Sequence, residues 1–285
     1  MKIVKFLGGL GNQMFQYAFY LSLKQYFKNV KADLTGFDNY DLHQGYELEK
    51  VFGIQVDQAS PFELRILDPD RRDWTSRKLK RLFGTKYASF LEREEFGYDP
   101  QIFTDKSSRY YWGYWQHFHY QEKIADLLRH TFLFRTHLEG ENILVKQKAL
   151  LPNSISLHVR RGDYLENDML RNVCDLNYYR KGIAILSQKI QDPIFIVFSN
   201  DIPWCQNNLP IKEAIFVDWN NGENSYKDMQ LIACCKHHII ANSSFSWWGA
   251  WLNPDPDKLV ISPKIWVNYP NVDTSGMILP GWISV

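Results

Sequence analysis

The stretch ISLHVRRGD, residues 155–163, decides how the second half of the chain folds. Its first five residues indicate a strand buried on both faces, and a basic, polar turn follows them. Apolar runs and segments of helical periodicity then alternate, with strands expected at 194–198, 215–217, 239–240 and 259–262, and helices at 178–190, 226–235 and 245–252. Apolar strands separated by helices are typical of a parallel sheet covered on both faces. We therefore predict an α/β domain of the nucleotide-binding type.

The N-terminal residues predict a second unit of the same class. An apolar run at 3–7 leads into the glycine-rich loop GGLGNQ, residues 8–13, and a pattern with helical spacing covers residues 14–26. A strand at 30–34 would complete a β-α-β unit. Residues 36–150 have mixed polarity, and we interpret them as the irregular remainder of this first domain.

The two halves are expected to join at residues 152–154, Pro-Asn-Ser, after an amphipathic helix and before the first strand of the second series. This join predicts an N-terminal domain of residues 1–152 and a C-terminal domain of residues 153–285, both α/β, facing a cleft. The last residues of the chain could also pack back on the first domain.

Composition and charge exclude several classes of function. The 33 basic residues nearly balance the 32 acidic ones, so no overall field would attract nucleic acid, although a basic patch runs from Arg71 to Arg81. The four cysteines show no CxxC spacing, and the adjacent pair Cys234 and Cys235 argues against a disulfide framework, which favours a reducing compartment. Neither a signal peptide core nor a run of about 20 apolar residues is found, so we expect a cytoplasmic protein.

Unusual residues follow the predicted strands, where ligands bind in open parallel sheets. These clusters are residues 158–163, 199–201, Asp218 and 242–246. Because side chains alternate along a strand, His158 and Arg160 should share one face and Arg161 the other. The planar fork of Arg160 can bind two phosphate oxygens, each bond contributing about 1.5 to 3 kcal/mol. We expect Arg161 to form an ion pair with Asp163 that shapes the turn.

The fourth cluster opens a helix with Ser243, Ser244, Phe245 and Ser246. A helix start offers unpaired N–H groups that bind phosphate, and hydroxyls add further donors. N-capping would explain one of these serines but not three. Asp228, on the preceding helix, could accept two N–H bonds from a guanine edge or could be an ordinary acid of a first helical turn, and the residues leave both interpretations open.

The N-terminal loop matches the dinucleotide-binding fingerprint in part. Residues 9–11, Gly-Leu-Gly, fit its start, and Asp33 stands where a ribose-binding acid would, but Met14 occupies the third glycine position. An NAD-dependent oxidoreductase is therefore a rival interpretation. The amide side chains of Asn12 and Gln13 argue against it, because a phosphate loop uses bare backbone.

Three motifs carry a resemblance to a known family. They are GGLGNQMFQYA at 8–18, HVRRGDY at 158–164 and NSSFSWWGAWL at 242–252. In this order they resemble the bacterial α-1,2-fucosyltransferases of glycosyltransferase family 11, and the resemblance extends from residue 1 to about residue 270. It implies a GT-B-like pair of Rossmann-type domains and inverting transfer of L-fucose from GDP-fucose to the 2-hydroxyl of a terminal galactose, as in an O-antigen unit. It implies no metal and no cofactor.

The resemblance also implies roles for single residues. Arg160 would contact the β-phosphate, His158 and Asp228 the guanine, and residues 243–246 the phosphate. The implied partners are GDP-fucose and a galactose-terminated glycan, with no nucleic acid. A lipid-linked acceptor would bring the protein to the inner face of the membrane.

The hypothesised mechanism needs charge stabilisation and a base. Arg160 and the serine-rich helix start would hold the negative charge that gathers on the leaving diphosphate. A carboxylate should take the hydroxyl proton, and Glu166, Asp168 and Asp163 are the candidates, the last if its ion pair leaves it available. Asn12 would reach the sugar or the diphosphate from the other domain.

Two remaining features leave alternatives open. Aromatic residues make up 15% of the chain and suit stacking on sugars, so a non-catalytic glycan-binding protein is a third interpretation. The acids that flank prolines at 68–70 and 255–257 mark turns rather than a metal site.

Overall fold

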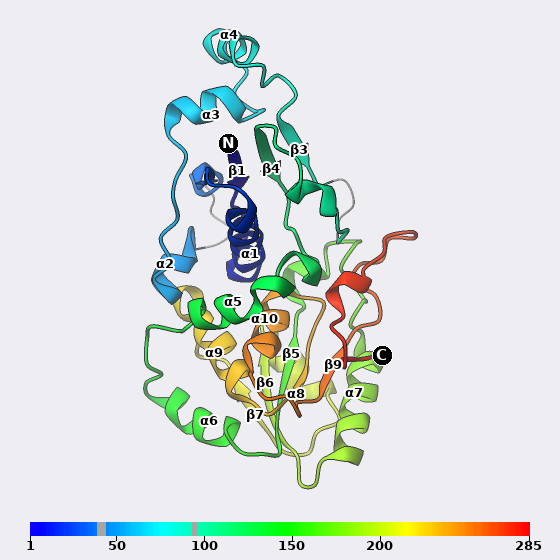
Figure 1. Ribbon diagram of the computed structural model, residues 1–285. Helices are drawn as coiled ribbons and strands as arrows, with labels where there is room; N and C mark the ends of the chain where they lie inside the picture. Colours follow the sequence, from blue (N-terminus) through cyan, green and yellow to red (C-terminus); the bar gives the residue numbers. More distant parts are fainter. Residues whose placement is uncertain (39–43, 93–95) are drawn as a thin grey trace. The chain divides into compact units, whose positions relative to one another are not determined.

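The computed structural model describes residues 1–38, 44–92 and 96–285, and it divides into two compact units, Met1–Arg135 and Thr136–Val285 (Figure 1). The sequence placed this division later, at 152–154. The difference comes from helix α6 (Glu141–Ala149), because its buried residues Val145 and Ala149 pack against Ile196 in the core of the second unit. The apolar face of α6 thus assigns it to the second unit.

The first unit contains a parallel sheet with the strand order β2-β1-β4-β3. Its strands are β1 (Lys2–Lys5), β2 (Val30–Asp33), β3 (Ser89–Leu91) and β4 (Arg109–Trp112). The strands expected near 3–7 and 30–34 are confirmed as β1 and β2. The interpretation of 36–150 as irregular is wrong for β3 and β4, which are too short to show a periodic pattern. Buried Tyr110 in β4 pairs in register with Ile3 of β1.

Helices surround this sheet: α1 (Leu10–Tyr26), α2 (Glu47–Phe52), α3 (Pro61–Leu67), α4 (Trp74–Leu82) and α5 (Ala125–Thr131), with 3-10 turns η1 (Thr35–Phe37), η2 (Pro100–Phe103), η3 (Phe118–Tyr120) and η4 (Glu122–Ile124). Helix α1 begins inside the glycine-rich loop, before the expected residue 14, because the Gly9 carbonyl accepts the N–H groups of Asn12 and Gln13. The buried amide of Gln13 holds the loop closed by donating to the carbonyls of Gly8 and Gly45, both at 2.8 Å.

The second unit has a parallel sheet with the order β10-β9-β8-β5-β6-β7. Its strands are β5 (Ser154–Val159), β6 (Ile194–Ser199), β7 (Ala214–Val217), β8 (His237–Ile239), β9 (Val260–Ser262) and β10 (Ile283–Ser284). Its other helices are α7 (Leu176–Lys189), α8 (Ile202–Asn208), α9 (Tyr226–Cys234) and α10 (Ser244–Leu252), with 3-10 turns η5 (Gly162–Tyr164), η6 (Gly222–Asn224) and η7 (Ser275–Met277). The predicted alternation of strands and helices is confirmed. Strand β10 at the chain end belongs to this sheet.

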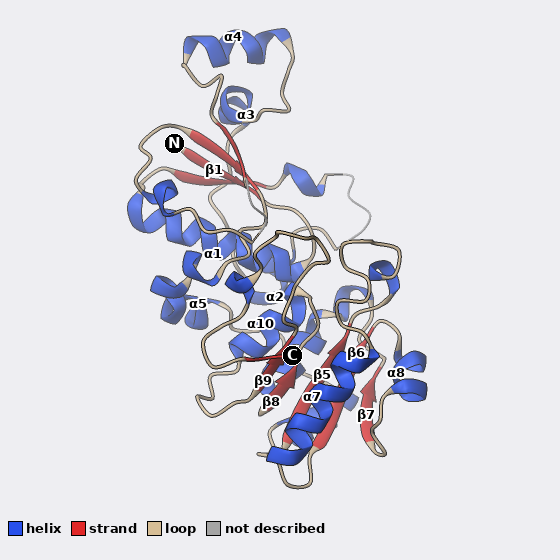
Figure 2. Ribbon diagram, turned by 90° about the vertical axis from the view of Figure 1, so that its right-hand side faces the viewer, coloured by secondary structure: helices blue, strands red, loops and turns tan. Residues whose placement is uncertain are grey.

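The two faces of this sheet have separate cores. On one face α7 packs Tyr179 and Leu186 against Leu157 of β5, and Figure 2 shows α7 lying over these strands. On the other face α6 and α9 pack against β6 and β7. A sheet covered on both faces explains why every residue of β5 is buried and why apolar runs predicted it.

The strand order reverses next to β5. From β5 the chain continues to β6 and β7 on one side, and it returns to β8 and β9 on the other. The carboxyl ends of β5 and β8 are therefore the topological switch point, where open α/β sheets bind ligands. Helices α9 and α10, beside this switch point, pack closely on each other. Gly249 of α10 permits this packing, because a Cβ atom there would lie only 2.5 Å from Cγ2 of Ile232 in α9.

Candidate functional site

Two adjacent arginines leave β5 in opposite directions. The Arg160 guanidinium lies 5.4 Å from the centre of the Tyr164 ring, and its Nη2 is 2.9 Å from Oδ1 of Asp163. Arg161 instead pairs its Nε with Oδ2 of Asp201 at 3.0 Å. The expected ion pair between Arg161 and Asp163 is wrong, because alternation along the strand turns Arg161 toward α8 and leaves Asp163 on the side of Arg160.

The loop after β6 supports this divergence. Asp201 caps α8 by accepting the Trp204 N–H at 3.1 Å. The Arg161 guanidinium carbon lies 4.2 Å from the centre of the Trp204 ring. Oδ1 of Asn200 accepts the Arg161 N–H at 2.9 Å. Gly162 has φ +38°, and a Cβ atom there would lie 2.4 Å from Nδ2 of Asn200. The cluster at 199–201 therefore shapes the arginine turn.

His158, next to the last residue of β5, is a buried polar residue of the predicted set. Burial, and then the nearby Arg160 charge, lowers its pKa to about 3, so the imidazole is neutral at pH 7. Its ring centre lies 5.8 Å from that of Phe245, the half-buried second residue of α10. Among the described residues, Nδ1 of His158 and Nε of Arg160 are buried and have no hydrogen-bond partner. Both atoms are donors or acceptors that a ligand could satisfy.

The start of α10 faces the same strand ends. Ser243 is its N-cap residue but makes no side-chain cap bond, and the Tyr164 hydroxyl donates to the carbonyl of the preceding residue, Asn242, at 3.3 Å. Ser246 is fully buried, and its hydroxyl accepts the Ala241 N–H at 3.2 Å. The structure thus places Ser243, Ser244 and Phe245 at the helix start and uses the Ser246 hydroxyl inside the turn after β8.

Asp228, in the first turn of α9, belongs to a polar network beyond β7. Nδ2 of Asn220 donates to its Oδ1 at 2.8 Å and also to Oδ1 of Asn142 at 2.8 Å, and Trp219 Nε1 donates to Asn142 at 2.9 Å. Burial raises the pKa of Asp228 to about 7. Neither asparagine was predicted from the sequence. Asn220 could have been found from its place just after a strand, whereas Asn142 comes from α6, which no motif marks.

The three carboxylates proposed as base stand in different settings. Asp163 is paired with Arg160, and Asp168 is 82% exposed and lies 3.0 Å from Nη2 of Arg171. Glu166 is exposed on the same loop. All three follow the arginine turn within the second unit, and the geometry distinguishes none of them as the base.

A polar pocket of about 290 Å³ adjoins the arginine turn. It lies within the second unit, and Arg160, Arg161 and Arg171 line it together with Asn242 at the end of β8. Arg160 and Arg171 on one pocket at the switch point favour a ligand with several negative oxygens, such as a diphosphate, whereas Arg161 is held by Asp201.

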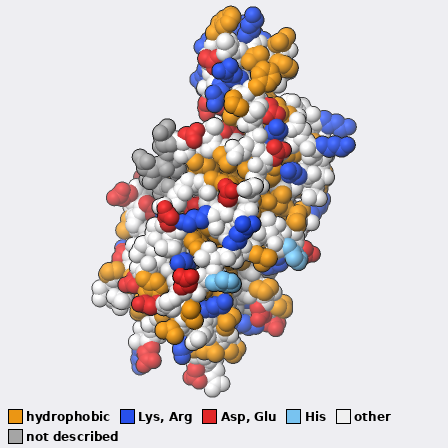
Figure 3. Space-filling model, turned by 90° about the vertical axis from the view of Figure 1, so that its left-hand side faces the viewer, with side chains coloured by type: hydrophobic (Ala, Val, Ile, Leu, Met, Phe, Trp, Pro, Cys, Tyr) orange, Lys and Arg blue, Asp and Glu red, His pale blue; other side chains and the backbone are white. Residues whose placement is uncertain are grey.

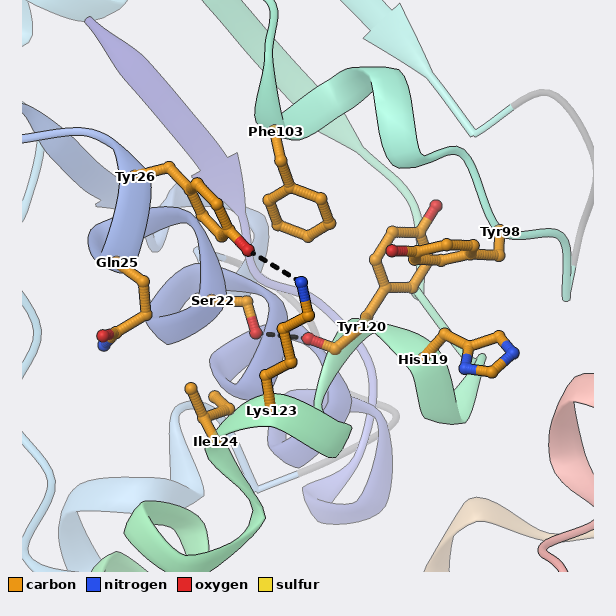
Figure 4. Close-up of a pocket in the computed structure, with 9 residues that line it drawn as sticks. All are labelled: Ser22, Gln25, Tyr26, Tyr98, Phe103, His119, Tyr120, Lys123 and Ile124. Carbon is orange, nitrogen blue, oxygen red and sulfur yellow. Dashed lines mark hydrogen bonds between the residues drawn. The ribbon is translucent and has the colours of Figure 1, made fainter.

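A second pocket, of about 230 Å³, lies within the first unit (Figure 4). The rings of Tyr26 and Phe103, 4.9 Å apart, and those of Tyr98 and Tyr120, 5.0 Å apart, form its walls. Nζ of Lys123 donates to the Tyr26 hydroxyl at 3.3 Å, and Figure 4 shows this contact as a dashed line between the two side chains. Aromatic faces beside a few polar groups are chemically suited to a sugar ring.

The N-terminal loop does not offer a dinucleotide site of the expected kind. Oδ2 of Asp33 accepts the Tyr110 hydroxyl at 2.5 Å, and Oδ1 accepts the N–H of Thr35 at 2.9 Å, so this buried carboxylate is bound internally. Asn12 lies in the first turn of α1, where its Oδ1 accepts Nε2 of Gln116 at 2.8 Å. The resulting geometry argues against Asp33 as a ribose ligand.

Residues 1–38, 44–92 and 96–285 contain no group of three or more His, Cys, Asp and Glu side chains that could hold a metal ion. Within the same residues, the helices are all too short or too polar to cross a bilayer.

Comparisons with known proteins identify the family. The model of glycosyl transferase family 11 matches residues 1–285. The α-1,2-colitosyltransferase of Escherichia coli is 32% identical over 99% of this chain and 98% of its own length. The O-antigen biosynthesis glycosyltransferase WbnK of E. coli is 30% identical over 98% of both. Mouse galactoside α-(1,2)-fucosyltransferase 1 is 29% identical over 86% of this chain and 61% of its own length.

Solved structures show the same architecture. The NodZ α-1,6-fucosyltransferase soaked with GDP-fucose aligns with a TM-score of 0.51, covering 93% of this chain and 95% of that chain at 14% identity. The NodZ fucosyltransferase from Bradyrhizobium aligns with the same TM-score at 15% identity, covering 89% and 93%. With the two parallel sheets described above, the predicted α/β, GT-B-like fold is confirmed.

Proposed function

Because the chain belongs to glycosyl transferase family 11, we propose that it transfers L-fucose from GDP-fucose to the 2-hydroxyl of a terminal galactose, with inversion at the transferred carbon. One observation carries this proposal. His158, Arg160 and Phe245 meet at the switch point of the second sheet, and two buried polar atoms there lack partners among the described residues. A nucleotide diphosphate would satisfy them.

The guanine would bind between His158 and Asp228. An ionised Asp228 can accept the two parallel N–H groups of a guanine edge, and Asn220 holds one carboxylate oxygen in place. The neutral imidazole of His158 can donate or accept a single bond to the base or its ribose. In this arrangement the base contacts a neutral and an acidic side chain, and the positive charge of Arg160 is left to bind the phosphates.

The diphosphate would bind Arg160 and the first turn of α10. Both phosphate oxygens that face Arg160 would replace Asp163 as its partner, releasing a carboxylate near the reacting sugar. The start of α10, where the Ser243 side chain makes no cap bond, adds N–H groups and a partial positive charge. Since these groups neutralise the leaving GDP, the proposed mechanism requires no metal ion.

In the reaction, the galactose 2-hydroxyl attacks the anomeric carbon of fucose from the face opposite GDP. A carbon–oxygen bond forms to the acceptor as the bond to the β-phosphate oxygen breaks, and GDP leaves with the electron pair. Asp163, Glu166 or Asp168 takes the hydroxyl proton. Arg160 stabilises the charge that grows on the diphosphate, so its contribution is larger in the transition state than in the bound substrate. A role for Asn12 remains part of this proposal.

Relatives suggest the substrates more closely. The names of the E. coli proteins indicate O-antigen synthesis and transfer of colitose, the 3-deoxy counterpart of fucose. A GDP-linked colitose is therefore the second candidate donor, and a surface polysaccharide unit ending in galactose is the proposed acceptor.

A ligand panel tests the proposed function. At about 100 times its Kd, GDP should raise Tm by roughly 5 °C, because a ligand that binds only the native state stabilises it by about 2.7 kcal/mol. UDP, NAD and free fucose should have little effect. Transfer of radiolabelled sugar from GDP-fucose and from GDP-colitose to lactose then identifies the donor. A response to NAD alone would indicate an oxidoreductase, and a response to lactose without GDP would indicate a glycan-binding protein.

The aromatic pocket of the first unit is our proposed site for acceptor sugars. Tyr98 is a wall of this pocket and remains 36% exposed, so a sugar ring can stack on it. Tyr98→Ala should raise KM for lactose about three- to tenfold, the range that an aromatic contact supplies, with kcat and GDP affinity unchanged. Tyr269→Ala, at an exposed tyrosine of the second unit, serves as the control. Equal KM values in the two variants would refute the assignment.

A further inference from the structure

Helix α4 and its flanks expose an unusual number of large apolar side chains. The five are Phe62, Trp74, Leu82, Phe83 and Tyr87, and we call them, with the neighbouring cations, the α4 surface. Trp74, Leu82 and Tyr87 are 72%, 76% and 77% exposed. Phe62 of α3 and Phe83 make an edge contact with ring centres 6.1 Å apart, so these two exposed rings adjoin each other.

The local structure holds these side chains outward. Asp73 caps α4 by accepting the Ser76 N–H at 3.0 Å, and Ser76 is buried on the inner side of the helix. Lys80 also turns inward, where its Nζ donates to the Arg71 carbonyl at 2.9 Å. With the inner side fixed, the helical period directs Trp74 and its neighbours at positions 78 and 81 to the opposite side, toward solvent.

The outward side is strongly basic. Residues 71–87 contain seven Lys and Arg against one acid, although the whole chain has a net charge of only +1. Nζ of Lys78 lies 5.2 Å from the Trp74 ring, and that of Lys86 lies 5.1 Å from the Tyr87 ring. In the part of the chain that the structure describes, the exposed cations of this surface form no ion pair with an acid: Arg72, Arg77, Lys78, Arg81 and Lys86.

The space-filling view shows the same mixture. Orange and blue atoms dominate the end of the first unit where Figure 1 places α3 and α4 (Figure 3). A purely apolar face would indicate a protein partner, and a purely basic face a polyanion in solution. Here Trp74 and Tyr87 each lie beside a cation that has no acidic partner among the described residues.

We propose that the α4 surface docks on an anionic lipid membrane. Short basic helices with exposed Trp, Leu and Phe lie in the plane of the lipid headgroups, with the apolar side chains entering the acyl boundary and the cations binding phosphate groups. Trp74 and Leu82 would enter the bilayer, and Lys78 and Arg81 would bind headgroups beside them. Docking in this way would hold the enzyme where a lipid-linked glycan is presented, but it depends on the chain's own surface and not on the acceptor.

Vesicle flotation of the full chain tests this proposal. Wild-type protein should bind phosphatidylcholine vesicles with about 30% phosphatidylglycerol, should not bind phosphatidylcholine alone, and should dissociate as salt rises. Lys78→Gln with Arg81→Gln should lower the partition constant about 30-fold, since each cation near an anionic surface contributes about fivefold. Trp74→Ser with Leu82→Ser should lower it about tenfold by removing apolar contact.

The matched control is Lys146→Gln with Lys148→Gln on α6, an exposed helix of the second unit with the same loss of charge. This variant should bind vesicles as wild type does, and all variants should keep the wild-type Tm. Equal binding by the α4 variants and the control would overturn the proposal, as would an absence of wild-type binding. Binding to a single-stranded oligonucleotide in preference to the anionic vesicles would instead indicate a nucleic-acid surface.

Discussion

Replacing Arg160 with Ala is expected to lower kcat for sugar transfer by about 10²- to 10⁴-fold. The proposed contact to the β-phosphate supplies two charge-assisted bonds of about 1.5 to 3 kcal/mol each, and they strengthen as GDP leaves. The fold should survive, because the Arg160 guanidinium forms its ion pair with Asp163, whose side chain is 59% exposed. Radiolabel transfer to lactose measures the rate, and Tm measures the fold.

The neighbouring arginine is a matched control for this result. Arg161 pairs with Asp201 and lies over Trp204, so Arg161→Ala should lower Tm while the rate per folded molecule stays within about tenfold of wild type. Arg160→Lys should be intermediate, because an ammonium keeps the charge but loses the planar fork. If both alanine variants lost activity equally, Arg160 would have no special role at the diphosphate.

Asp228→Asn is the second change with a large expected effect. It should weaken GDP binding about 10- to 100-fold, because the carboxylate would lose one of two charge-assisted bonds to guanine. It should also remove the preference for GDP over inosine diphosphate, which lacks the 2-amino group. Calorimetric titration measures both affinities. Asp218→Asn, an exposed acid at the end of β7, is the control and should bind both nucleotides as wild type does.

The pH dependence gives this prediction an independent readout. Since burial raises the pKa of Asp228 to about 7, wild-type GDP affinity should rise with pH through 7 and then level off, whereas the Asn variant should lack this step. Stability should change in the opposite sense. The folded state holds the proton more tightly than the unfolded chain, so ionisation of Asp228 reduces stability as pH rises from about 4 to 7.

Relative to wild type, Asp228→Asn should therefore have a higher Tm at pH 8 than at pH 5. His158, whose pKa is lowered to about 3, makes the folded state less stable as pH falls below about 6.5, but it does so equally in both proteins. A GDP affinity of the variant equal to wild type at pH 8 would show that Asp228 does not contact the base.

The sequence predicted the second sheet well because its strands are buried on both faces. An apolar run such as Ile155–Val159 needs no partner to be recognised, and the polar residues that follow it then locate the switch point. Divergence of Arg160 and Arg161 followed from strand alternation alone. The partner of Arg161 did not, because Asp201 is reached across two neighbouring strands and pairing depends on tertiary geometry.

The first unit was predicted less completely for a different reason. Strands β3 and β4 have only three and four residues, and buried Tyr110 and Tyr111 are adjacent in sequence, so neither alternation nor an apolar run marks them. The site shows the same limit, since Asn142 reaches Asp228 only through Asn220. Contacts between elements distant in sequence leave no periodic signal.

The origin of Asn142 on α6 determines how such enzymes can be recombined. A chimera that exchanges the first unit is best joined between Arg135 and Thr136, so that α6 remains with its own sheet. A junction at residues 152–154 would import a foreign helix and separate Asn142 from Asn220. Such a graft would exchange the proposed acceptor site but would also weaken the selectivity for guanine. This loss would occur although no residue of the exchanged part touches the base in our proposal.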